Sequence, residues 1–69
     1  MNTETYLEEA RVAHRKILEA AAYLREAAGP FADTPRRRAI EAVAADAEKL
    51  ALDLEGHMQE VLRGLWQGE

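Results

Sequence analysis

Apolar residues recur along the chain at alternating spacings of four and three, which is the period of one face of an α-helix. One region with this pattern covers residues 4–28, and a second covers residues 35–66. In both regions neighbouring apolar positions widen the row into a stripe, which in the second spans roughly half of the helix circumference. One antiparallel neighbour cannot cover so wide a stripe, so we expect two helices that each contact two others.

Alanine is frequent in both stripes and lets helix axes approach closely. The first stripe consists of Tyr6, Ala10, Ala13, Ile17, Ala20, Leu24 and Ala27, with Leu7, His14, Leu18, Ala21 and Ala28 beside them. The second consists of Ile40, Ala44, Ala47, Ala51, Leu54, Met58, Val61 and Leu65, with Val43, Leu50 and His57 on one flank and Leu62 and Trp66 on the other.

The segment GPFADTP, residues 29–35, separates the two stripes. Gly29 fits the left-handed position after a helix end, and Pro30 cannot continue that helix. Thr34 followed by Pro35 matches an N-cap and a first helical position. We therefore expect an all-α fold: an antiparallel helical hairpin, with helices at about 4–28 and 35–66, that forms one domain over residues 1–69.

Two details of the helices are open at this stage. Thr5 with Glu8 matches a capping box, whereas Asn2 or Thr3 would start the first helix a turn earlier. Gly56 costs about 1 kcal/mol in helix propensity. Because the apolar period continues through it, we expect one long second helix, with a kink at Gly56 as the alternative.

The hairpin register predicts which residues face each other. With the turn at residues 29–34, Tyr6 lies near His57, and His14 lies nearer Lys49 than His57. The first helix ends opposite about Glu60. Roughly 25 residues give about 37 Å and roughly 32 give about 48 Å, so the end of the second helix is expected to project by more than a turn.

The projecting apolar residues predict self-association. Burying each large side chain is worth about 1.5 to 3 kcal/mol. We expect two hairpins to form an antiparallel four-helix bundle, in which the overhang of one chain meets Phe31 in the turn of the other. A frayed C-terminal segment is the alternative. The predicted dimer interface is Phe31, Leu54, Met58, Val61, Leu62, Leu65 and Trp66.

Composition supports a partner subunit. A chain of 69 residues is small for an independent core, and such domains usually add disulfides, a metal or a second subunit. There is no Cys, which excludes disulfides and thiolate metal sites and favours a cytoplasmic location. No apolar run approaches the roughly 18 residues of a membrane-spanning helix, and the N-terminal residues lack the apolar core of a signal peptide. We expect a mature, soluble protein.

The charge distribution disfavours nucleic acid as a partner. The net charge is -4, with seven basic and six acidic residues in positions 1–38 but two basic and seven acidic residues in positions 39–69. The acidic second half repels phosphate backbones.

Candidate catalytic chemistry is sparse. The chain has no Cys and no Ser, and its three Thr residues lie where helix caps are expected. His14 and His57, the two imidazoles, are separated in the hairpin register and cannot share a metal ion within one chain. We expect no catalytic residue, no cofactor and no metal site, and therefore no enzyme.

Two surface features are candidates for binding a partner. Arg36, Arg37 and Arg38 start the second helix, where the helix dipole disfavours positive charge, so they either contact an acidic partner or pair with Asp33 and Glu41. Val12 and Tyr23, with Lys16 between them, share a strip of the first helix away from its apolar stripe. They are either the edge of a second interface or ordinary exposed residues.

The expected hairpin resembles the Rop family of plasmid proteins, which dimerise into a four-helix bundle and bind RNA. The resemblance covers the shape of the chain and no motif, and the acidic second half departs from an RNA-binding surface. We expect a non-enzymatic protein-interaction module: a small dimeric helical inhibitor, adaptor or co-chaperone that binds a larger protein. The alternative is a Rop-like nucleic-acid-binding regulator that uses the three arginines and the first helix.

Overall fold

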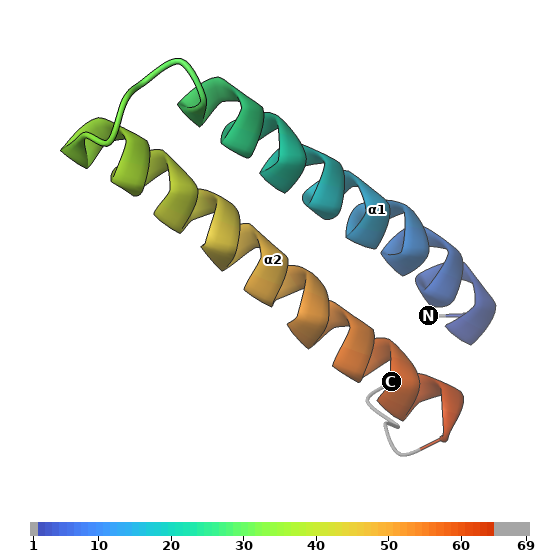
Figure 1. Cartoon of the computed structure of the whole chain (residues 1–69). Coiled ribbons are helices and arrows are strands. Elements are labelled where there is room, and N and C mark those ends of the chain that lie inside the picture. Colours follow the sequence, from blue (N-terminus) through green and yellow to red (C-terminus); the bar gives the residue numbers. More distant parts are fainter. Residues whose placement is uncertain (1, 65–69) are drawn as a thin grey trace.

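The computed structural model describes residues 2–64 and shows two antiparallel helices lying side by side (Figure 1). Helix α1 spans Thr3–Ala28 and helix α2 spans Pro35–Leu62, and a short turn joins them. The hairpin is elongated, with extents of 47 × 16 × 15 Å. The expected all-α helical hairpin is confirmed.

The helix starts are capped by side chains. The Asn2 side chain accepts hydrogen bonds from the backbone N–H groups of Glu4 (2.7 Å) and Thr5 (3.4 Å), so α1 begins at the earlier of the expected positions. The Thr34 hydroxyl accepts from the N–H of Arg37 (3.2 Å), and Pro35 is the first helical residue of α2, as expected.

Gly29 does not adopt the left-handed conformation that the sequence predicted. Its φ of -54° and ψ of -44° are right-handed. The Gly29 N–H donates to the Glu26 carbonyl and the Phe31 N–H donates to the Ala28 carbonyl, both at 3.1 Å. These tight bonds close the last turn of α1, and no residue of reversed handedness is needed.

Helix α2 ends earlier than expected. It is continuous through Gly56, as predicted, but it stops at Leu62 instead of extending to about residue 66. The N–H of Gly64 donates to the Val61 carbonyl (3.0 Å), and Gly64 has a φ of 73°. A glycine of this conformation just after a helix is a common terminator. Leu65 and Trp66 lie outside the described residues.

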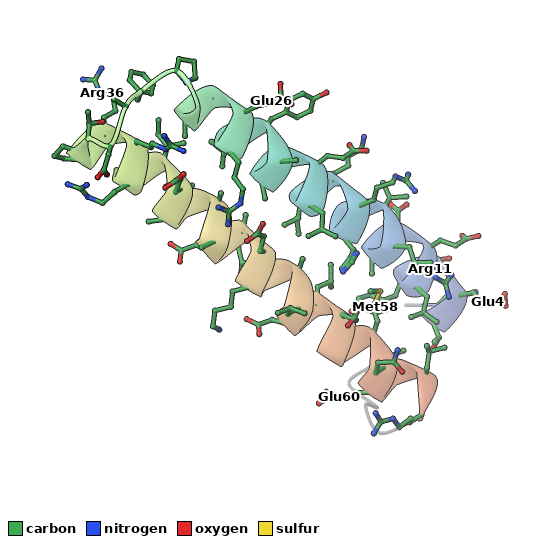
Figure 2. All side chains as sticks on the ribbon, in the orientation of Figure 1. Glu4, Arg11, Glu26, Arg36, Met58 and Glu60 are labelled. Atoms are coloured by element: carbon green, nitrogen blue, oxygen red, sulfur yellow. The ribbon has the colours of Figure 1, made fainter. Side chains whose placement is uncertain are left out.

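The core is a narrow seam between the two helices. Figure 2 shows Met58 directed between the helices, whereas Glu26 and Glu60 project away from the seam. The small side chains of the seam allow the helix axes to approach closely, and no large side chain of residues 2–64 is completely buried. The buried residues are Leu7, Ala10, Ala21, Ala28, Ala44, Ala51 and Val61.

The predicted projection of Val61 beyond the first helix is wrong. Its side chain is only 9 % exposed within the single chain. The two helices are of similar length, 26 and 28 residues, because α1 starts at Thr3 and α2 stops at Leu62. Helix α1 therefore covers α2 almost to its end.

Candidate interaction surfaces

A contact between Tyr6 and His57 fixes how the two helices are aligned at the open end of the hairpin. A hydrogen bond joins the Tyr6 hydroxyl to Nδ1 of His57, and the two rings meet edge to face with centroids 5.3 Å apart. This neighbour pair is the one that the hairpin register predicted. Both residues are half-buried and lie at the same edge of the seam.

The Tyr6–His57 edge carries a row of exposed apolar residues on each helix. Residues seven apart lie on one side of a helix, because seven residues are nearly two full turns. Tyr6 therefore shares its side of α1 with three exposed alanines, and His57 shares its side of α2 with two exposed apolar residues, Val43 (54 % exposed) and Leu50 (60 % exposed). We call this surface the apolar face; it consists of Ala13, Ala20, Ala27, Val43 and Leu50.

The opposite edge of the seam is crossed by charged pairs. The Arg25 guanidinium donates to both carboxylate oxygens of Glu48, at 2.7 and 3.2 Å. This hydrogen-bonded pairing lowers the pKa of Glu48 and raises the pKa of Arg25. Nearer the open end, Nε2 of His14 lies 3.9 Å from a carboxylate oxygen of Glu55.

The side chain that His14 meets across the seam is that of Glu55, not that of Lys49. Counting residues from the turn predicts only how far along the helix axes two residues lie. It does not predict the direction in which each side chain points. Lys49 is two residues before the buried Ala51, about 200° around the helix, and so faces outward. There its ammonium group pairs with Asp53, one turn further along α2, at 3.3 Å.

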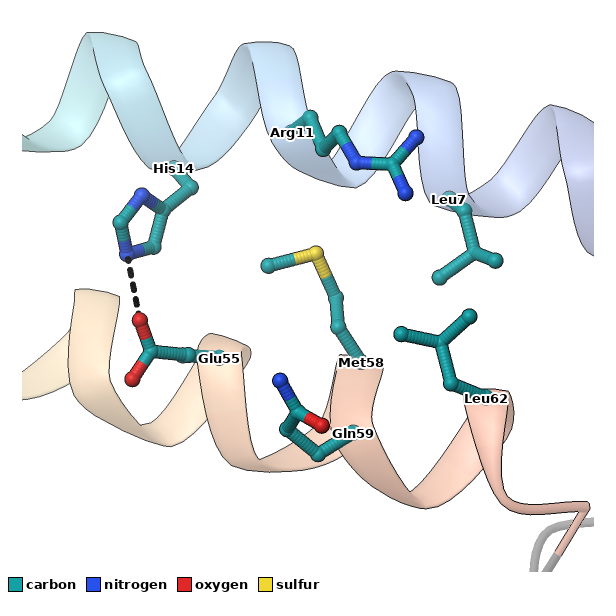
Figure 3. A pocket seen from close by; sticks show the side chains of 7 residues that line it. All are labelled: Leu7, Arg11, His14, Glu55, Met58, Gln59 and Leu62. Atoms are coloured by element: carbon teal, nitrogen blue, oxygen red, sulfur yellow. Dashed lines mark ion pairs between the residues drawn. The ribbon is translucent and has the colours of Figure 1, made fainter.

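A pocket of about 280 Å³ opens on the charged edge, between the start of α1 and the end of α2 (Figure 3). Leu7 and Leu62 point toward each other across it, and Met58 extends from α2 toward α1. The periodicity of the sequence gave no sign of this pocket, because it depends on the side-chain lengths at the end of the seam. The residues that line it are Leu7, Arg11, His14, Glu55, Met58, Gln59 and Leu62.

Two of the three turn arginines are paired with acidic neighbours. Nε of Arg37 donates to Glu41 at 3.2 Å, and Nη1 of Arg38 donates to Asp33 at 2.7 Å. Glu41 and Asp33 are the residues that we expected the arginines to pair with if they did not contact an acidic partner.

The third arginine covers the aromatic residue of the turn. The guanidinium carbon of Arg36 lies 5.7 Å from the centre of the Phe31 ring, a cation–π contact. Phe31 is half-buried, and its carbonyl accepts a hydrogen bond from Arg37 at 3.4 Å. Phe31 therefore already has neighbours from its own chain.

The strip of Val12, Lys16 and Tyr23 lies on α1 away from the seam, where the sequence placed it. Tyr23 is 71 % exposed, and the other two residues are also exposed. A large aromatic side chain on an outer face is available to a binding partner without any change of the hairpin.

The predicted dimer-interface residues differ in their exposure within one chain. Val61 is buried in the seam, and Phe31, Leu54 and Met58 are half-buried, whereas Leu62 is 56 % exposed and lines the pocket; Leu65 and Trp66 lie outside the described residues. Val43 and Leu50, which are exposed, were recognised from the sequence only as one flank of the second stripe. Leu52 is also exposed and lies outside both stripes.

Within residues 2–64, no group of three or more metal-binding side chains comes together. In the same part of the chain, neither helix is apolar over a length that would cross a membrane. Comparison of the chain with protein-family models, with curated proteins and with solved structures found no match.

Proposed function

We propose that this chain is a non-enzymatic protein-interaction module that pairs with a second copy through the apolar face to form a four-helix bundle. The observation that carries the proposal is the exposure of Val43 and Leu50 beside three exposed alanines. Within residues 2–64, the ion pairs that join the two helices, His14–Glu55 and Arg25–Glu48, lie on the opposite edge of the seam.

Packing energetics favour this arrangement. A single hairpin of this chain leaves the apolar face in water, and burying a large apolar side chain is worth about 1.5 to 3 kcal/mol. Ala20 and its two companion alanines leave room for the larger Val43 and Leu50 of a second copy. A surface with small residues on one helix and large ones on the other can be self-complementary about a two-fold axis.

The cost of removing charged groups from water also favours the apolar face as the interface. Covering the opposite edge would bury the Arg25–Glu48 pair, whose charges are now partly exposed to water. The five residues of the apolar face are all uncharged, and Tyr6 and His57, at the open end of the same edge, contact each other.

The larger partner is proposed to bind the strip of Val12, Lys16 and Tyr23, in the manner of an inhibitor, adaptor or co-chaperone. The alternative of a nucleic-acid-binding regulator draws less support. Arg37 and Arg38 pair with carboxylates of their own chain, and the net charge is -4.

A pair of leucine variants tests self-association. Leu50→Lys places a charge in the apolar face, whereas Leu52→Lys makes the same change on the same helix at a residue exposed to a similar extent (66 %) but outside that face. The thermal midpoint of a dimer rises with protein concentration. We expect this rise for the unchanged chain and for Leu52→Lys, and its loss for Leu50→Lys. Equal behaviour of the two variants would contradict the proposed face.

A second test addresses the larger partner. Tyr23→Ala removes an aromatic side chain that is 71 % exposed, without touching the seam. We expect it to weaken the capture of a protein from the cells that make this chain, whereas Leu52→Ala leaves capture unchanged. Submicromolar binding of RNA at physiological salt, unaffected by Tyr23→Ala, would favour the nucleic-acid alternative instead.

A further inference from the structure

We propose that the second copy packs on the apolar face with its turn at the same end as the turn of the first copy. This inference rests on the proposed function and adds the orientation of the partner. In this same-end dimer, two-fold symmetry sets α1 of each chain beside α2 of the other. The residue pattern predicted the other possibility, an opposite-end dimer, in which α1 lies beside α1 and α2 beside α2.

The alignment of the two helices decides which residues lie at the same height along the hairpin. The Tyr6–His57 contact fixes one such level pair at the open end. Steps of seven residues from this contact toward the turn give level pairs that each join an exposed alanine of α1 to a larger exposed residue of α2. These pairs are Ala13 with Leu50 and Ala20 with Val43.

The same-end dimer places small side chains against large ones. Ala20 of one chain meets Val43 of the other, and Ala13 meets Leu50, because α1 faces α2 at the same height. An opposite-end dimer that covers both large residues sets Val43 against Leu50 and Ala13 against Ala20. It would hold the two copies of α2 apart and leave a gap between the two copies of α1. Interiors pack closely with few voids, so the even spacing of the same-end dimer is favoured.

Two charged residues flank the apolar face at nearly the same height. Lys16 and Asp46 are exposed, and neither has an ion-pair partner among residues 2–64. They lie ten and eleven residues from the Tyr6–His57 contact, so their heights differ by about 1.5 Å. On its own helix, each lies about 40° to 60° further from the seam than the adjacent residues of the apolar face. Both are therefore at the rim of an interface formed by that face, where Lys16 also borders the strip proposed for the larger partner.

These charges distinguish the two orientations. In the same-end dimer, Lys16 of each chain is level with Asp46 of the other, which gives two ion pairs per dimer. In the opposite-end dimer, Lys16 faces Lys16 and Asp46 faces Asp46, and like charges set opposite each other disfavour an interface. The same-end dimer also makes Glu9 level with Asp53, but Asp53 is already paired with Lys49 of its own chain.

Distances between spin labels test the orientation directly. The chain has no Cys, so one introduced Cys carries a single nitroxide label per chain. Ala32→Cys places the label in the turn, and Glu4→Cys places it in the first turn of α1, at the open end (Figure 2). For both variants we expect double electron–electron resonance to give a distance set by the width of two hairpins, each 16 × 15 Å across, and well below the hairpin length of 47 Å.

A label at mid-height separates failure of the orientation from failure of the dimer. Ala45→Cys lies at an exposed position near the middle of α2, so both dimers give a short distance there. A short distance at Ala45 with distances near the hairpin length at Ala32 and Glu4 would overturn the same-end orientation and leave the dimer standing. No dipolar coupling at any of the three positions, with the mass of one chain, would overturn the proposed function as well.

Charge reversal supplies an independent readout. In the same-end dimer Lys16→Asp sets carboxylates against each other, and we expect the dimer Kd to rise roughly 2- to 30-fold because two exposed ion pairs are lost. Adding Asp46→Lys to the same chain should restore the Kd. Arg15→Asp, at an exposed position of α1 outside the apolar face, makes the same change in net charge and is the control. An equal effect of Lys16→Asp and Arg15→Asp, or no rescue by Asp46→Lys, would contradict the same-end orientation.

Discussion

Tyr6 and His57 lie 51 residues apart in the sequence and are joined by a hydrogen bond across the open end of the hairpin. The bond is part-buried, so removing it should cost about 0.5 to 1.5 kcal/mol. We expect Tyr6→Phe to lower the free energy of unfolding by this amount while keeping the edge-to-face ring contact. Urea denaturation measures the loss, and Tyr23→Phe, at an exposed tyrosine, is the control. Equal effects of the two substitutions would show that the contact contributes nothing.

Replacing Ala21 or Ala22 by leucine should change the stability of the fold by different amounts. Ala21 is 1 % exposed in the seam, whereas Ala22 is exposed on the outer side of α1. Because a larger side chain at a filled position forces the helices apart, Ala21→Leu should destabilise the fold by about 1 to 3 kcal/mol. Ala22→Leu should change stability by a few tenths of a kcal/mol. Thermal or urea unfolding of the two variants at one concentration provides the comparison.

These alanines also show what the sequence could predict and what it could not. The periodicity and the Thr34–Pro35 pair were sufficient to predict two helices and the turn between them. Ala20 and Ala21 are equally apolar and adjacent, so the pattern alone does not decide which of them faces the other helix. The structure buries Ala21 and leaves Ala20 on the apolar face.

The ends of the elements were predicted less well, for local reasons. Gly29 and Gly64 both follow a helix, but only Gly64 has a positive φ. The residue pattern predicted that role for Gly29 and an α2 that continues past Gly64, which made the predicted overhang of α2 longer than the structure has it. The pocket depends on how Leu7, Met58 and Leu62 fill space where the seam ends, which residue spacing does not encode.

Replacement by alanine should change stability in opposite directions at two glycines, Gly56 within α2 and Gly64 just after its end. Gly56 is helical, and a Cβ there would meet nothing within 4 Å, so Gly56→Ala should stabilise the fold by about 0.5 to 1 kcal/mol. Gly64 has a φ of 73°, a conformation that alanine adopts with strain. Gly64→Ala should therefore destabilise the helix end. A loss of stability in Gly56→Ala would show that another chain or segment packs closely against that position.

Acidification should weaken the Arg25–Glu48 pair. Hydrogen bonding to Arg25 lowers the pKa of Glu48 from its ordinary value of 4.5. A carboxyl whose pKa is lower in the folded state contributes stability above its unfolded pKa, and loses it as the pH falls through the folded value. We expect the urea midpoint of the unchanged chain to fall below about pH 4.5 more steeply than that of Glu48→Gln.

Arg25→Gln provides an independent check of that pH dependence. It removes the same ion pair by replacing the basic partner. The urea midpoint of this variant should therefore fall less steeply with decreasing pH than that of the unchanged chain, to a degree similar to that of Glu48→Gln. If the urea midpoint fell as steeply with decreasing pH in both variants as in the unchanged chain, other carboxylates would account for the pH dependence.

The mass of the unchanged chain in solution tests the proposed four-helix bundle most directly. Sedimentation equilibrium at micromolar concentration should give twice the 7.7 kDa of one chain, with dissociation on dilution. The apolar face makes this the expected result, because one hairpin leaves Val43 and Leu50 in water. A stably folded species of 7.7 kDa over the whole concentration range would contradict the account.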